Sequence, residues 1–70
     1  MKADKTLLEM KYARIIEAIA KEQSISREQA MEMFYNSNTF KLISEGVADL
    51  HCRSDLYLAD EVILETENSK

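Results

Sequence analysis

The sequence predicts a small all-α domain, a bundle of four helices. Its 70 residues contain no proline and one glycine, so little interrupts a helix. Apolar residues make up 46% of the chain and recur at helical spacing rather than in alternation. Polar turns divide the chain into four segments, and we expect helices at about 5–22, 26–35, 38–51 and 54–66. They form a single helical domain over residues 1–70, with an ordered core at about 5–66.

The first helix has a continuous apolar stripe. Residues on this stripe should face the core, because a helix returns to the same side every three to four residues. They are Leu8, Tyr12, Ile15, Ile16 and Ile19. Leu7 and Met10 lie off the stripe and have no evident use within the chain.

The second helix has the clearest start signal. Ser26 is a good N-cap, and Gln29, three residues later, completes a capping box. The polar run Asn36-Ser37-Asn38 should end this helix, because short polar side chains compete for backbone hydrogen bonds. This run also supplies a cap for the third helix, whose inward stripe is Phe40, Ile43 and Val47.

Gly46 interrupts the third helix and allows two interpretations. One is a helix end or a kink, because glycine destabilises a helix interior by up to about 1 kcal/mol relative to alanine. The other is a close helix crossing without room for a Cβ atom. By phase, His51 falls near the Phe40–Val47 stripe if the helix continues that far. We therefore expect His51 to have a structural role, bonded to a backbone carbonyl at the turn into the last helix.

The last helix should begin after Ser54, a good N-cap. It is apolar over an unusually wide arc, more than one packing face requires. Two interpretations follow: a small bundle wraps the helix fully, or part of the arc contacts a partner. On the second interpretation the partner-binding residues form an apolar centre with an acidic rim. They are Leu58, Val62 and Leu64 at the centre, with Asp60, Glu61 and Glu65 at the rim.

The sequence contains few side chains that could form a catalytic site or a metal site. His51-Cys52 is the only pair of soft or titratable ligands, whereas a zinc or iron site needs three or four convergent ligands. Cys52 as a nucleophile would need a nearby base, and an adjacent histidine is poorly placed for that. The sequence therefore predicts no catalytic residue, no metal site, no cofactor and no enzyme activity.

Charge favours a protein partner over nucleic acid. Residues 36–70 carry three basic and seven acidic side chains, and the whole chain has a net charge of −4. An acidic domain is poorly suited to phosphate backbones but suits a basic protein surface. The segment Arg27 to Ile43 nevertheless resembles a helix-turn-helix, so a DNA-binding regulator is the alternative. Its second helix exposes Asn38, Thr39, Lys41, Ser44 and Glu45, which offers one lysine for phosphates.

The cysteine content and the distribution of apolar residues indicate the cellular location. It has one cysteine, no apolar leader and no run of about 20 apolar residues. We expect a cytoplasmic protein without a membrane segment.

The order of several short motifs resembles a small bacterial family, domain of unknown function 3791. The motifs are Ser24-x-Ser26, Gln29-Ala30, Met33-Phe34, Ile43, Leu50-His51, Tyr57-Leu58 and Asp60-Glu61-Val62. The resemblance covers roughly Leu8 to Leu64 and implies a single short helical domain. It supplies no activity. It implies a bacterial cytoplasmic protein encoded beside other small proteins, some resembling ADP-ribosyltransferases, and hence an accessory or antitoxin-like role.

Together these observations predict helix-mediated association, with a neighbouring gene's product or as a homodimer. Acidic rims repel each other in a homodimer that pairs the last helices, which favours a basic heterologous partner.

Overall fold

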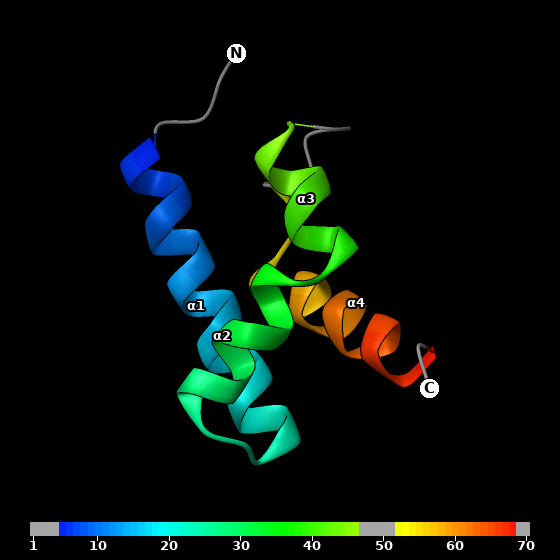
Figure 1. Ribbon diagram of the computed structural model, residues 1–70. Coiled ribbons are helices and arrows are strands. Elements are labelled where there is room, and N and C mark those ends of the chain that lie inside the picture. Colours follow the sequence, from blue (N-terminus) through cyan, green and yellow to red (C-terminus); the bar gives the residue numbers. More distant parts are fainter. Residues whose placement is uncertain (1–4, 47–51, 69–70) are drawn as a thin grey trace.

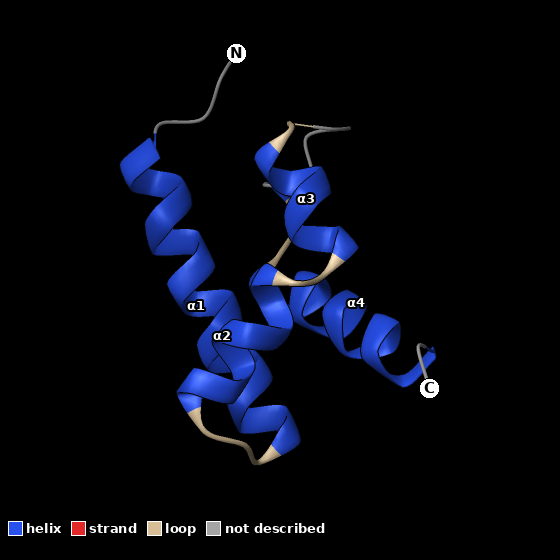
Figure 2. Cartoon of the chain, viewed as in Figure 1, coloured by secondary structure: helices blue, strands red, loops and turns tan. Residues whose placement is uncertain are grey.

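The computed structural model describes residues 5–46 and 52–68, where four α-helices and no strand are found (Figures 1 and 2). The helices are α1 Lys5–Gln23, α2 Arg27–Tyr35, α3 Asn38–Ser44 and α4 Asp55–Asn68. The predicted all-α bundle of four helices is confirmed.

The end of α1 shows how a chain with one glycine makes its first turn. Ser24 adopts a left-handed conformation with φ of 54°, and the Ile25 amide donates to the carbonyl of Ala20 at 3.1 Å. This is the Schellman arrangement, in which a left-handed residue usually occupied by glycine closes the helix. Ile25 then packs against the core and leads directly to the cap of α2.

The predicted capping box of α2 is confirmed. The Ser26 hydroxyl accepts from the Gln29 amide, and the Gln29 side chain accepts from the Ser26 amide, both at 3.1 Å. Ser37 caps α3 in the same way by accepting from the Phe40 amide at 3.1 Å. Ser54 caps α4 by accepting from the Tyr57 amide at 3.1 Å, also as predicted. Three serines therefore mark the starts of three helices.

The third helix is shorter than expected. It ends at Ser44 rather than extending to about residue 51, so its predicted length is wrong. Gly46 has φ of 73°, a left-handed conformation that glycine adopts at little cost, and its amide donates to the Ile43 carbonyl. Of the two interpretations of Gly46, the helix end is confirmed. The expectations for Val47 and His51 concern residues outside the described part of the chain.

The core lies where α1, α2 and α4 converge, with Ile43 added from α3. The residues that are buried there are Ile15, Ile16, Ile19, Ala30, Phe34, Ile43, Leu58, Ala59, Val62 and Ile63. Tyr12 and Phe40, also expected inside, are half-buried against this cluster. The stripe predicted for α1, and Ile43 of the stripe predicted for α3, therefore face the core as expected.

Asp55 joins the start of α4 to the middle of α1. Its carboxylate accepts from the Lys11 Nζ at 2.8 Å and from the Arg14 Nε at 2.9 Å. Burial acts to raise the pKa of Asp55, but the hydrogen bonds and charges of Lys11 and Arg14 outweigh it, so that pKa is lowered. Lys11 also donates to the Arg53 carbonyl. These contacts join the start of α4 to α1; in Figure 1, α1 runs down the page and α4 runs from the centre toward the lower right.

Candidate functional site

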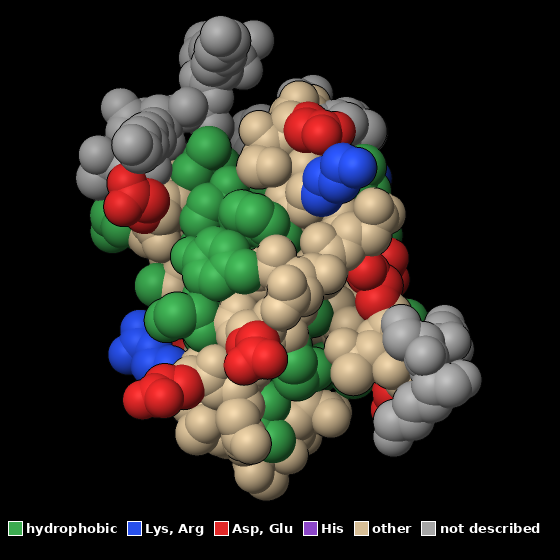
Figure 3. Space-filling model, viewed as in Figure 1, with side chains coloured by type: hydrophobic (Ala, Val, Ile, Leu, Met, Phe, Trp, Pro, Cys, Tyr) green, Lys and Arg blue, Asp and Glu red, His purple; other side chains and the backbone are tan. Residues whose placement is uncertain are grey.

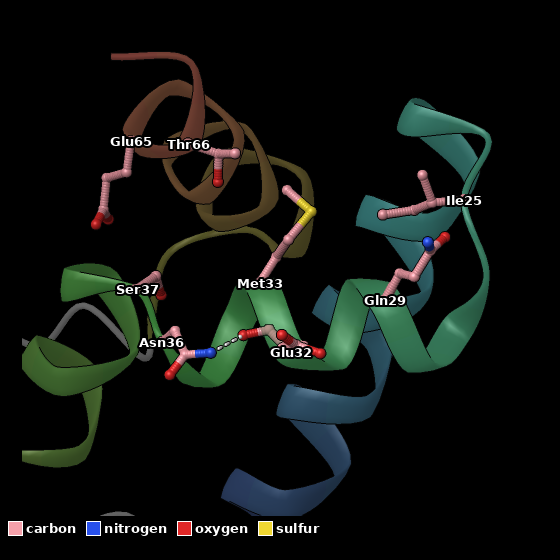
Figure 4. A pocket seen from close by; sticks show the side chains of 8 residues that line it. All are labelled: Ile25, Gln29, Glu32, Met33, Asn36, Ser37, Glu65 and Thr66. Atoms are coloured by element: carbon pink, nitrogen blue, oxygen red, sulfur yellow. Dashed lines mark hydrogen bonds between the residues drawn. The ribbon is translucent and has the colours of Figure 1, made fainter. Parts of the chain in front are cut away.

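A groove between α2 and α4 has a volume of about 580 Å³ and opens to solvent (Figure 4). Its lining residues are Ile25, Gln29, Glu32, Met33, Asn36, Ser37, Glu65 and Thr66. The polar ones are largely engaged at helix ends. Gln29 belongs to the capping box, Ser37 caps α3, and the Asn36 side-chain amide donates to the Glu32 carbonyl at 2.9 Å. The groove therefore offers apolar surface but little free polar chemistry.

Glu65 illustrates this use of polar groups. Its carboxylate accepts from the backbone amides of Asn38 at 2.6 Å and Thr39 at 2.9 Å, and from the Thr39 hydroxyl. Amides in the first turn of a helix have no partner within the helix, and a carboxylate there also suits the helix dipole. Glu65 thus attaches α4 to the start of α3. It was expected on an acidic rim facing a partner, and that expectation is wrong because the carboxylate turns inward to α3.

The predicted apolar centre on α4 is also largely wrong. Leu58 and Val62 are 0% exposed, because their side of α4 faces the core between α1 and α2. Leu64 differs, with half of its surface exposed. Asp60 and Glu61 are exposed as expected. Three of the six predicted partner-binding residues therefore remain on the surface.

The outer faces of α1 and α4 share most of the exposed apolar side chains. We call this surface the α1–α4 face; its exposed large apolar residues are Leu7, Met10, Leu56, Tyr57 and Leu64. Two further ones in the described chain, Met31 and Tyr35, lie on α2. The sequence placed Leu7 and Met10 off the core stripe of the first helix and Leu64 among the partner-binding residues. Leu56, which belongs to the wide apolar arc of α4, is 60% exposed.

Two shallow grooves mark the seam between α1 and α4 on this face, and Leu56 and Leu64 line them. The first, about 360 Å³, is lined by Arg14, Ala18 and Lys21 of α1 and by Leu56 of α4, among others. The second, about 570 Å³, continues along the same seam between Glu22 and Leu64. Leu7 and Met10 lie one or two turns before Arg14 on its side of α1, since they precede it by seven and four residues. Leu56 and Leu64 are likewise on one side of α4.

A second apolar surface lies where α1 meets α2 and α3. Figure 3 shows hydrophobic side chains gathered over this junction. Four rings contact one another there, with all centroid distances between 4.9 and 6.5 Å. They are Tyr12, Phe34, Tyr35 and Phe40. Burial, and then the neighbouring Tyr35, raise the pKa of Tyr12. We call this surface the aromatic face; it exposes Tyr35 and, one turn earlier, Met31.

The geometry of α3 gives little support to the alternative that this protein binds DNA through a helix-turn-helix. The second helix of such a motif uses the residues of its first turn to reach bases. In α3 that turn is occupied by the Glu65 carboxylate, and Thr39 is buried rather than exposed as expected. Lys41 is the one basic residue of the seven in α3. Phosphate contact would thus rest on a single lysine beside a carboxylate.

Among the described residues, no group of three or more His, Cys, Asp or Glu side chains converges to hold a metal ion. Cys52 is exposed and not in a disulfide. In the same part of the chain, no helix combines the length and apolar character that a bilayer-spanning segment requires.

Glu22 of α1 and Asp60 of α4 line the same groove at the α1–α4 seam. The hydrogen bond with Asp60, then burial, then the Asp60 charge raise the pKa of Glu22. A raised pKa means that the folded chain holds this proton more tightly than the unfolded chain does. The contribution of protonated Glu22 to the free energy of unfolding is fully present below the pKa that this glutamate has in the unfolded chain. It is lost as pH rises through the folded pKa.

Glu22→Gln should therefore raise the melting temperature at pH 7, because an amide can donate to Asp60 at any pH. Near pH 4, about the ordinary pKa of glutamate, the gain should largely disappear. Circular dichroism melts at both pH values measure this, with Glu61→Gln as a control on the exposed side of α4. An equal gain at both pH values would show that the carboxyl contact does not set the stability here.

No protein-family model, curated protein or solved structure matches this chain. The resemblance to domain of unknown function 3791 therefore stays a prediction.

Proposed function

We propose that this protein is a non-enzymatic protein–protein interaction module that binds its partner through the α1–α4 face. The observation that carries the proposal is the grouping of five exposed large apolar side chains on two adjacent helices. Single exposed apolar residues are normal on protein surfaces, but aligned ones mark interaction sites. The charged residues around them, Arg14, Lys21, Asp60 and Glu61, form the polar rim that such sites have.

Two further features support this proposal. A chain of this length buries only about 60% of its unfolded surface, so a partner that covers more apolar area adds useful stability. The groove between α2 and α4 uses its polar residues to cap helices, which suits a structural role better than catalysis. An accessory or antitoxin-like role beside a neighbouring gene's product, in a bacterial cytoplasm, is consistent with such a module.

Site-specific photocrosslinking in the native host tests the proposal. A benzoylphenylalanine replaces Tyr57 on the α1–α4 face or Tyr35 on the aromatic face, in separate strains. The two tyrosines are a matched pair, being 47% and 45% exposed. We expect a discrete crosslinked product from position 57 and none from position 35. Adding Leu64→Asp should abolish the product.

Products from position 35 alone would move the docking surface to the aromatic face and contradict the proposal. Products from neither position would contradict an interaction role altogether. A gel-shift assay with random duplex at low salt tests the DNA-binding alternative, because electrostatic binding is strongest there. We expect no shift.

A further inference from the structure

The groove between α2 and α4 combines apolar side chains with negative charge. Of the described residues that line it, Ile25 and Met33 are apolar and half-buried, whereas Glu32 and Glu65 are acidic. No lysine or arginine is among them. Figure 4 shows the Met33 side chain extending from α2 toward α4. We call this surface the α2–α4 groove; it presents apolar contacts beside acidic ones.

Acidic residues continue along both helices that border the α2–α4 groove. On α2, Glu28 lies one turn before Glu32 on the same side, and both are exposed. On α4, the exposed Glu61 likewise lies one turn before Glu65. Helix α4 contains five acidic residues and no basic one, and the basic residue of α2, Arg27, does not line the groove. The groove therefore lies in a region of negative charge.

Internal contacts decide which acidic group of the α2–α4 groove a ligand would meet. The Glu65 carboxylate already accepts from the backbone amides of Asn38 at 2.6 Å and Thr39 at 2.9 Å. Glu32 is exposed, and both ion pairs found among the described residues use Asp55 instead. A cation entering the groove would therefore meet the Glu32 carboxylate. An anion would meet no basic side chain in the described lining.

The size and flexibility of the α2–α4 groove indicate what else its occupant brings. The volume of about 580 Å³ is within the range of about 300–1,000 Å³ that is typical of ligand sites. Methionine is unbranched and flexible, so Met33 can adapt to apolar side chains of different shapes. Because the groove opens to solvent, a chain can continue beyond it. These features suit a peptide segment with an apolar side chain better than an isolated small cation.

Charge distinguishes the α2–α4 groove from the α1–α4 face. The two shallow grooves of that face are lined by Arg14 and Lys21 as well as by Glu17 and Glu22, so both signs of charge are mixed there. The α2–α4 groove shares no lining residue with either of them. Its charge is of one sign, and charge complementarity therefore selects a basic occupant.

We propose that the α2–α4 groove binds a linear basic segment of another protein. One large apolar side chain of that segment packs against Ile25 and Met33. A flanking lysine or arginine lies against Glu32, with Glu28 one turn away. Complementarity of this kind speeds association and selects against acidic segments. The proposal goes beyond the proposed function, because it assigns a second binding surface whose lining includes no residue of α1.

Nuclear magnetic resonance of the isotope-labelled full chain tests the proposal with a defined probe, acetyl-Lys-Arg-Leu-Arg-Lys-amide. Titration should shift the backbone amide signals of Gln29, Met33 and Thr66 until they saturate. A probe with glycine in place of leucine should bind about fivefold more weakly, because it loses the apolar contact. A probe with glutamate at every basic position should cause no saturable shift, since like charges then meet at Glu32.

Charge reversal on the protein tests the same contact from the other side. Glu32→Lys should weaken binding of the basic probe about tenfold, because its cations then meet a like charge. Glu17→Lys is the matched control, since it changes the net charge equally on the exposed side of α1, in a groove of the α1–α4 face. It should change the affinity by less than about twofold, because salt screens exposed charges away from the groove. Circular dichroism melts first establish that both variants are folded.

Three results would overturn the proposal, and two of them need only the wild-type chain. Signals of the α2–α4 groove that stay unshifted at several millimolar probe would show that it binds no basic segment. Shifts centred on Leu56 and Leu64 would place the probe on the α1–α4 face instead. Equal binding of the probe by the wild type and a folded Glu32→Lys variant would remove charge complementarity as the basis of recognition.

Discussion

Phe34→Ala should unfold most of the protein at 25 °C. Phe34 is fully buried, and its ring contacts those of Tyr12, Tyr35 and Phe40 at centroid distances of 5.2 to 5.4 Å. Removing a buried phenylalanine ring typically costs about 3–5 kcal/mol. A domain of this size has only about 3–5 kcal/mol of stability from a single core. The loss therefore approaches the whole free energy of unfolding.

Far-ultraviolet circular dichroism and urea titration measure this effect. Phe34→Leu is the matched control, since it keeps an apolar side chain in the site and should cost less than the alanine. Tyr35→Ala removes a ring from the same cluster, but one that is half-exposed, so the domain should stay folded. If Phe34→Ala melted like Tyr35→Ala, the ring of Phe34 would not be the centre of the core.

The aromatic cluster shows what helical spacing can and cannot predict. The sequence assigned Tyr12 and Phe40 to inward stripes, because each recurs with the apolar period of its own helix. It did not predict that Tyr35 would join them. Contact among rings from three helices depends on how the helices cross, and crossing geometry is set by packing rather than by local pattern.

Helix ends were predictable where they depend on adjacent residues. The Ser26–Gln29 box and the Ser54 cap involve partners three residues away, so a short motif is sufficient. The end of α3 was less clear because two local signals disagreed. An apolar phase that continued to His51 favoured a long helix, whereas Gly46 favoured an end. The left-handed glycine prevailed, at φ of 73°.

The candidate site was only partly predictable for a related reason. Glu65 caps a helix that begins 27 residues earlier, so no local pattern indicates its role. Leu58 and Leu64 both belong to an apolar helix, and only packing decides which of them is covered. The wide arc of α4 correctly indicated more apolar surface than one contact needs. It could not indicate which edge of the arc stays outside, because that depends on where α1 and α2 lie.

Leu58→Asp should therefore unfold the protein, whereas Leu64→Asp should leave it folded. Leu58 is 0% exposed, so the substitution removes a buried leucine, at about 2–5 kcal/mol, and leaves a carboxyl group without a partner. Leu64 is 50% exposed, and an aspartate there remains in water. Its cost is a few tenths of a kcal/mol from Asp60, a like charge four residues away.

Thermal melts and sedimentation together separate the two substitutions. Leu58→Asp should show no cooperative melt, so its loss of association would carry no information about the surface. Leu64→Asp should melt within a few degrees of the wild type, because a few tenths of a kcal/mol shifts the midpoint of a small domain only slightly. It should nevertheless associate more weakly, since it places a charge in the apolar part of the α1–α4 face. A folded Leu64→Asp variant that associates like the wild type would remove α4 from the interface.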